Sequence, residues 1–356
     1  MGTLRTIFAI AVVFAHSYGY MFVGGKNAVQ LFYMISGFLI SYILVERKAY
    51  PSIRSFYINR YLRLYPIYFV IAFISFLAFG IVSIFGKDVD FFKVYNDAPY
   101  AANLLLIFSN ATIFLQDWVM FAGVKSNQLV FSTDFRKSEV VLYPALLVPQ
   151  AWTLGVELTF YLIAPFILSK QKILFLLLIL SISLRIYLIS IGLGNKDPWT
   201  YRFFPTELAL FLLGALAHQF LLPLYINMLS VKYIKKISSL ATYALIFISL
   251  VFSFIPVSEL FKTNTLFTLF LLLMPLTFIF QSNREWDKWI GNLSYPIYVC
   301  HILVINVITV FAKLIHFDKL LICISSVIFS IVFAIFLNKF VGNPIESLRN
   351  KFRIKT

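Results

Sequence analysis

Two side chains in the first apolar segment could do chemistry together. Arg5 and His16 lie in residues 3–22, which carry no other charged side chain. At about 100° per residue, their spacing places both on one face of a helix, about 16 Å apart along its axis. Both groups are costly to hold in hydrocarbon. Because an imidazole can exchange protons at neutral pH, this segment is the first candidate for catalysis.

A pair of arginines forms a second candidate. Arg60 and Arg63 are spaced i, i+3 within the stretch 56–66, so they project from one helix face. Paired guanidinium groups suit bidentate recognition of phosphate. Ordinary anchoring of a membrane helix by basic and tyrosine side chains is the alternative.

Small residues within an apolar segment are a weaker signal. Ser36 and Gly37 would allow either another helix or a ligand to come close to the backbone. Packing between helices is sufficient to account for them.

Polar side chains also occur in later apolar segments. Glu157 lies two turns into one of them, where a carboxylate is a functional candidate by default. It could orient a histidine, accept a sugar hydroxyl or pair with an arginine of another helix. Tyr298 and His301 are i, i+3 neighbours, and a lone histidine at such a position is more often a satisfied core residue. Arg185 and Glu207 are further intramembrane charges without an evident partner.

Composition identifies the elements that must position these residues. Of 356 residues, 61% are hydrophobic and 13% charged, and the mean hydropathy is +0.88. These values predict an all-α polytopic membrane protein. The net charge of +15 does not indicate nucleic-acid binding, because the basic residues lie in short loops where the positive-inside rule and anionic lipid account for them. Cys300 and Cys323 have no metal-site spacing, so neither a metal site nor a disulfide is expected.

About ten segments are long enough to cross a bilayer. They are residues 3–22, 28–46, 64–85, 150–168, 172–191, 205–224, 237–255, 264–281, 291–311 and 320–341. The distribution of basic residues predicts that both termini are cytoplasmic. Residues 100–121 contain several polar side chains and are expected to be re-entrant, interfacial or part of a folded outer loop. We expect a single integral-membrane domain over 1–356 with no separate soluble domain.

The motifs, taken in order, resemble those of the acyltransferase 3 family, the integral-membrane O-acyltransferases of bacterial surface glycans. The resemblance covers nearly the whole chain. It rests on Arg5 with His16, Ser36-Gly37-Phe38, Phe56 with Arg60, Arg63 and Pro66, Trp152-Thr153-Leu154 with Glu157 and Tyr161, and Ser294-Tyr295-Pro296 with Tyr298 and His301. Two positions depart from the family pattern: Thr153 replaces a serine and Asn343 precedes Pro344, where relatives often have an acid.

The resemblance implies transfer of an acyl group, acetyl above all, from cytosolic acetyl-CoA to a hydroxyl of a surface or lipid-linked glycan, in the bacterial inner membrane and without a metal. His16 is expected to act as general base. The other expected site residues are Arg5 and Glu157 in catalysis, Arg60, Arg63, Ser36 and Gly37 in binding acetyl-CoA, and Trp152, Tyr161, Tyr298 and His301 in binding the acceptor.

Two other classes of function remain open at this point. A proton-coupled transporter or flippase of a lipid-linked glycan could use His16, Glu157 and Arg185 as relay groups. The absence of an internal repeat argues against the common transporter architecture. A receptor or assembly subunit predicts no covalent transfer at all.

Overall fold

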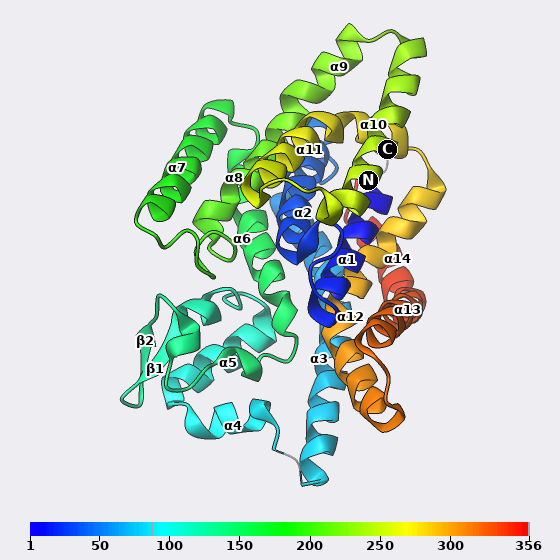
Figure 1. Ribbon diagram of the computed structural model, residues 1–356. Helices are drawn as coiled ribbons and strands as arrows, with labels where there is room; N and C mark the ends of the chain where they lie inside the picture. The colour runs from blue at the N-terminus through cyan, green and yellow to red at the C-terminus, as the bar shows by residue number, and fades with distance from the viewer. Residues whose placement is uncertain (87, 355–356) are drawn as a thin grey trace. The chain divides into compact units, whose positions relative to one another are not determined.

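The computed structural model describes residues 1–86 and 88–354, and these residues are almost entirely helical (Figure 1). The helices are α1 Gly2–Ser17, α2 Gly24–Ser41, α3 Ile53–Ile84, α4 Asp90–Asp97, α5 Tyr100–Thr112, α6 Trp152–Ile167, α7 Gln171–Ser190, α8 Phe204–Leu216, α9 Leu222–Met228, α10 Val231–Val251, α11 Glu259–Gln281, α12 Glu285–Ile315, α13 Lys319–Leu337 and α14 Asn343–Asn350. A short antiparallel hairpin, β1 Ala122–Lys125 and β2 Gln128–Phe131, follows α5.

Within the described residues, eight helical segments are long and apolar enough to cross a membrane. This finding confirms an all-α polytopic membrane protein. Each of the ten predicted segments also coincides with a helix, but α1 and α6 have 16 residues each. Such a helix is about 24 Å long, shorter than the hydrocarbon core of about 30 Å.

The first helix ends earlier than the apolar run in the sequence predicts. The run continues to residue 22, whereas α1 stops at Ser17. Gly19 and Gly24 have positive φ angles of 136° and 74°, and Phe22 has a φ of 54°. A left-handed backbone cannot continue a right-handed helix, so the chain turns here. His16 therefore lies in the last turn of α1 and not within a longer span.

Residues 100–121 do not form one continuous helix. The helix α5 stops at Thr112, because Ile113 has a left-handed φ of 64°, and a single 3-10 turn precedes the hairpin. Two of the polar side chains here have internal partners. Asn110 donates to the carbonyl of Ala145 (2.9 Å) and accepts from the Leu147 amide (2.9 Å), while Gln116 donates to the hydroxyl of Tyr68 (2.9 Å). These contacts explain why the segment tolerates amides that lipid would not solvate.

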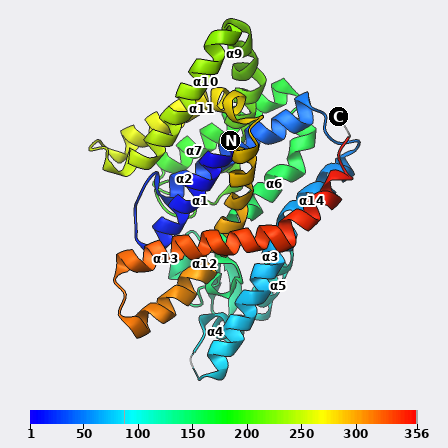
Figure 2. The ribbon, with the colours of Figure 1, turned by 90° about the vertical axis from the view of Figure 1, so that its right-hand side faces the viewer.

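The contacts divide the chain into two compact units. Unit 1 comprises residues 1–59, 164–174 and 210–356, and unit 2 comprises residues 60–163 and 175–209. In unit 1, α1 packs against α2, α12 and α13. Figures 1 and 2 show α12 and α13 side by side. Phe8 of α1 contacts Phe270 of α11, with 5.8 Å between ring centroids.

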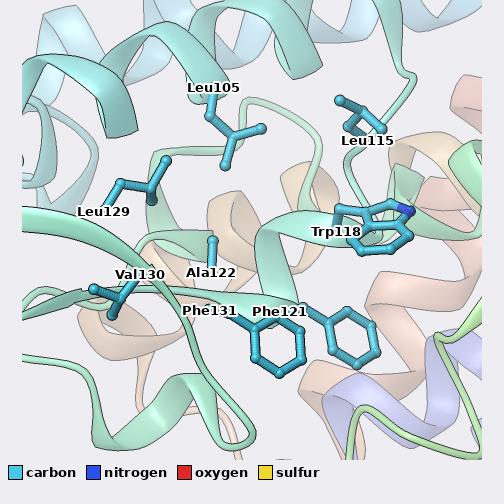
Figure 3. Close-up of a pocket in the computed structure, with 8 residues that line it drawn as sticks. All are labelled: Leu105, Leu115, Trp118, Phe121, Ala122, Leu129, Val130 and Phe131. Atoms are coloured by element: carbon cyan, nitrogen blue, oxygen red, sulfur yellow. The ribbon is translucent and has the colours of Figure 1, made fainter.

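Unit 2 contains two open apolar hollows. A hollow of about 370 Å³ lies beside the hairpin (Figure 3). Its lining is Leu105, Leu115, Trp118, Phe121, Ala122, Leu129, Val130 and Phe131. The second, of about 710 Å³, lies among aromatic side chains of α3 and α4 and residues of α5. Neither hollow contains a charged side chain.

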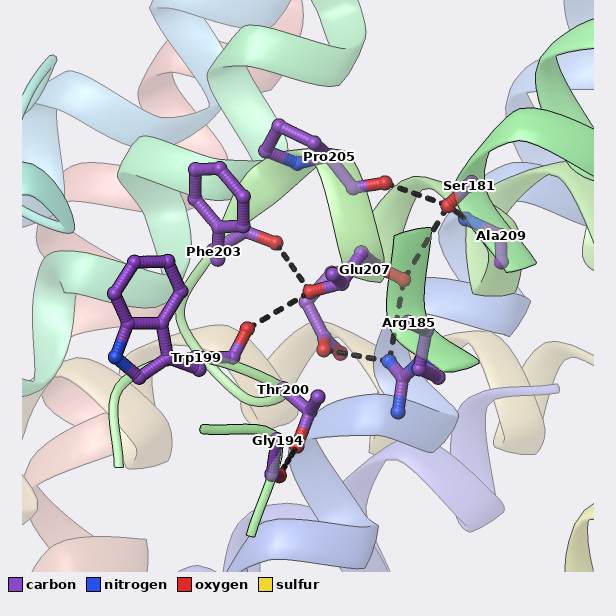
Figure 4. A network of polar contacts seen from close by, with 10 residues as sticks. Ser181, Arg185, Gly194, Trp199, Thr200, Phe203, Pro205, Glu207 and Ala209 are labelled. Atoms are coloured by element: carbon purple, nitrogen blue, oxygen red, sulfur yellow. Dashed lines mark hydrogen bonds and ion pairs between the residues drawn. The ribbon is translucent and has the colours of Figure 1, made fainter. Parts of the chain in front are cut away.

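An ion pair joins α7 to α8 within unit 2. Arg185 donates to Glu207 at 2.7 Å and to the carbonyl of Thr206 at 3.2 Å, and the Glu207 side chain is 0% exposed. Ser181 adds a bond to the Pro205 carbonyl (2.6 Å) and accepts from the Ala209 amide (2.9 Å), as Figure 4 shows. The two intramembrane charges that lacked a partner in the sequence are therefore paired with each other.

Asp117 is a buried acid of unit 2. It is 1% exposed, and one carboxylate oxygen, Oδ1, has no hydrogen-bond partner in the described residues. A Cβ placed on Gly155 of α6 would lie 2.7 Å from that oxygen. Burial raises the pKa of Asp117 to about 7, although the backbone amides of Asp117 and Trp118 oppose the shift.

We expect the Arg185–Glu207 pair to show strong coupling. Arg185→Met should cost about 3 kcal/mol, because it leaves the buried Glu207 carboxylate uncompensated. Glu207→Leu should cost less, because the Arg185 side chain that it leaves is 25% exposed. The double variant should cost clearly less than the sum. Thermal unfolding of the purified protein in detergent measures all three. Additive losses would contradict the pairing.

Asp117 should make stability depend on pH. Its carboxyl ionises near 3.8 in the unfolded chain but only near 7 in the folded chain. The contribution of Asp117 to the free energy of unfolding is therefore fully present below pH 4, and it falls by up to about 4 kcal/mol as the pH rises to 7. Asp117→Asn should match the wild-type melting temperature at pH 4.5 and exceed it at pH 8. An equal difference at both pH values would show that Asp117 is not the cause.

Candidate functional site

A cluster of rings from α1 and α12 surrounds His16 in unit 1. The His16 ring lies 5.1 Å from that of His301, centroid to centroid, with the planes tilted by 36°. Tyr298 lies 5.7 Å from His301. His16 is exposed, whereas His301 is 0% exposed. The structure thus brings His16 beside Tyr298 and His301, which the sequence indicated as a separate pair.

The register of α1 and α12 sets this cluster. At the start of α1, the Asp287 carboxylate accepts hydrogen bonds from the amides of Gly2 (2.6 Å) and Thr3 (2.8 Å) and from the Thr3 hydroxyl (2.7 Å). The Thr6 hydroxyl donates to the carbonyl of Ile290 (2.7 Å). The carboxylate satisfies amides that a helix N-terminus leaves open. It thereby fixes α1 beside the first turn of α12.

Two glycines allow the backbones to meet at the same point. A Cβ on Gly291 would lie 2.5 Å from the Cα of Gly2, so a larger residue cannot fit without moving a helix. His16 follows Gly2, and His301 follows Asp287, by the same number of residues. Because each residue of a helix adds about 1.5 Å, both histidines lie about 21 Å beyond the contact of Gly2 with Asp287, at one level.

Arg5 belongs to the same helix as His16. The helix α1 is continuous between them, so the predicted common face follows. Arg5 is half-buried in the second turn, close in sequence to the Asp287 contact. The helix holds it about 16 Å from His16. The two side chains therefore serve different parts of any substrate.

A second cluster lies in unit 2, between α3 and α6. Tyr161 donates its hydroxyl hydrogen bond to Glu157. The Arg60 guanidinium lies over the Tyr161 ring, 5.8 Å from its centroid, and both side chains are buried. Arg63 is half-buried one turn further along α3 and acts electrostatically on Tyr161. Two cations thus lie beside a phenol that is hydrogen bonded to a carboxylate.

Trp152 is covered by other residues of unit 2. The Arg202 guanidinium lies 4.3 Å from its ring centroid, and the Tyr201 ring lies 4.8 Å away. Arg202 is itself held by Asp197, with 2.7 Å between Nε and Oδ1. A cation over an indole face is a favourable contact. Trp152 is thus packed between side chains of the protein, and this packing holds the first residue of α6 in place.

Gly37 is buried against a helix. A Cβ there would lie 1.9 Å from the carbonyl oxygen of Phe211, and one on Gly214 would lie 2.0 Å from that of Met34. The two glycines let α2 and α8 pack at close range within unit 1. Packing between helices therefore accounts for Gly37, while Ser36 beside it is half-buried.

The comparison with known families decides the identity of this fold. A family model described as an acyltransferase domain, Acyl_transf_3, matches residues 2–339. The chain belongs to the acyltransferase 3 family. The resemblance drawn from the motifs is thereby confirmed. No curated protein and no solved structure matches the chain.

Two residues of these clusters were missed in the sequence of this acyltransferase. Asp287 sits in the first turn of α12, where an acid is ordinary, so nothing marked it as a partner of α1. Arg202 lies in the loop before α8 and gave no sign that it would cover Trp152. Both roles depend on residues distant in the chain, and one sequence carries no signal of that pairing.

The contact of Gly2 with Gly291 should be sensitive to a single methyl group. Gly291→Ala is expected to cost about 1–3 kcal/mol and to reduce acyl transfer, because α1 must move. Gly80→Ala is the matched control: its Cβ meets nothing within 4 Å in α3, and alanine favours a helix. Detergent melting temperature and transfer rate measure both variants. Equal behaviour of the two would rule out the close contact.

Proposed function

We propose that this acyltransferase moves an acetyl group from cytosolic acetyl-CoA to a hydroxyl of a bacterial surface or lipid-linked glycan in the inner membrane. The family and the multi-pass helical fold support a membrane acyltransferase. The observation that carries the finer proposal is the exposed His16 at the end of α1, packed on the buried His301. An exposed imidazole on a rigid helix is accessible to a substrate hydroxyl.

His16 is the general base in this proposal. It removes the proton of the acceptor hydroxyl as the oxygen attacks the thioester carbonyl. The thiolate of CoA then leaves and takes the proton back from the imidazolium, so the products are the O-acyl ester and free CoA. A positioned base typically contributes 10²–10⁴-fold to the rate. No metal is required for these steps.

The arginines have the chemistry to bind the donor. Arg60 and Arg63 carry planar guanidinium groups that suit the phosphates of acetyl-CoA. Both interact with Tyr161, whose hydroxyl is hydrogen bonded to Glu157, and this restrains the two side chains. Arg5 would hold another part of the donor. Ser36, which precedes the packing residue Gly37 on α2, would also contact the donor. Glu157 would take part in catalysis as a carboxylate whose orientation is set by its hydrogen bond with Tyr161.

The remaining predicted residues are assigned to the acceptor. Tyr161, Trp152, Tyr298 and His301 are all buried, so they would act on the acceptor by shaping and supporting the side chains that contact it. The transporter alternative loses one of its relay groups, because Arg185 is committed to Glu207. No observation favours a receptor or an assembly subunit.

His16→Ala should abolish acetylation without preventing insertion. Envelope glycans from cells that express the wild type should carry an acetyl-sized mass increment, and those from His16→Ala cells should lack it, with a rate at least about 10²-fold lower. Mass spectrometry at matched membrane levels measures this.

Ser17→Ala, in the same turn, is the matched control and should retain the increment. Its hydroxyl donates to the Val13 carbonyl along the helix and also shares a hydrogen bond with Cys323 of α13, away from the acyl-transfer chemistry proposed for His16. Full acetylation by an inserted His16→Ala protein would refute the role of His16. No increment from the wild type would favour transport.

A further inference from the structure

The imidazole of His301 is held in one tautomer. Its Nδ1 lies 2.6 Å from the carbonyl oxygen of Tyr298. A carbonyl oxygen can only accept, so Nδ1 carries the hydrogen. Since the side chain is 0% exposed, a charged imidazolium would be costly at this position. His301 is therefore neutral, and its second nitrogen, Nε2, is an acceptor.

That acceptor is unused in the part of the chain that the structure describes. Nε2 of His301 is closed to solvent and has no hydrogen-bond partner there. Buried polar atoms are normally paired, and one left open calls for an explanation. A substrate hydroxyl cannot reach a covered atom directly. A neighbouring side chain is the donor that the geometry allows.

His16 is the neighbour in position to donate. A hydrogen bond between ring nitrogens places two imidazole centroids about 5 Å apart, and the observed separation is 5.1 Å. A rotation of the exposed His16 ring is therefore enough to aim an N–H at Nε2. Neutral His16 has one N–H, whereas the protonated ring has two. The second donor appears only when His16 has taken a proton.

From this we propose that His301 is a positioning residue that accepts a hydrogen bond from the His16 imidazolium during acyl transfer. The inference rests on the proposed function. The O–H bond of the acceptor breaks and an N–H bond forms on His16, while the acceptor oxygen bonds to the acyl carbon. When the C–S bond breaks, the thiolate takes the proton from His16. His301 neither gains nor loses a proton at any step.

A neutral acceptor suits this environment. In serine proteases an aspartate orients the catalytic histidine and stabilises its charged form. A carboxylate buried among apolar helices would add a second charge, which hydrocarbon surroundings penalise. The imidazole of His301 supplies a lone pair at a fixed place on α12 with no net charge. It stabilises the transition state more than the ground state, which is what accelerates the reaction.

The test uses the full chain in detergent with radiolabelled acetyl-CoA and the lipid-linked glycan fraction of the host envelope. His301→Phe keeps a ring but removes the acceptor. It should lower kcat by about 10²-fold and leave the KM for acetyl-CoA within about twofold. His301→Gln keeps an acceptor oxygen and should recover about tenfold. In a His16→Ala background, His301→Phe should change the rate little further.

Cys300→Ala is the matched control, because this buried neighbour on α12 faces Ser330 of α13. It should keep wild-type kcat. A wild-type rate for His301→Phe, no advantage of Gln over Phe, or a full extra loss on the His16→Ala background would overturn the inference while the proposed function stands. No transfer by the wild type would overturn both.

Discussion

The backbone contact between the first turn of α1 and the first two turns of α12 is the constraint on which the histidine cluster depends. Gly2 and Gly291 meet without side chains between them, and Asp287 ties the open amides of α1 to the neighbouring helix. Two parallel helices joined at one end keep their relative register along their length, since each rises by about 1.5 Å per residue. His16 and His301 meet because of the contact of Gly2 with Asp287, about 21 Å away.

The second cluster depends on a different kind of constraint. In unit 2, polar groups within apolar surroundings are held by one another: Tyr161 by Glu157, Arg202 by Asp197, and Asn110 by the backbone of residues 145–147. Electrostatic contacts are stronger where water is excluded. The bond between Tyr161 and Glu157 holds the ring over which the Arg60 guanidinium lies, and a guanidinium held in place loses little entropy when an anion binds.

Much of this fold could be predicted because hydropathy is a local property. Each apolar run became a helix, and the polar residues of 100–121 correctly excluded a simple span. The predicted end of α1 was wrong because residues 18–22 are apolar enough to continue a helix, and only the backbone conformation at Gly19 and Phe22 shows the turn. Partners could not be predicted. The pairs of Arg185 with Glu207 and of Trp152 with Arg202 join residues whose proximity arises from packing.

The same partners separate structural from chemical groups among the polar residues inside the helices. Arg185 is committed to Glu207, and His218 is held between Ser41 and Glu46 at 2.9 Å from each. A group whose hydrogen bonds are already complete has little left to offer a substrate. His301 is different, since one nitrogen is fixed by Tyr298 and the other has no partner in the described residues. Because folding gains nothing from an open buried acceptor, its place beside an exposed imidazole is best explained by the reaction.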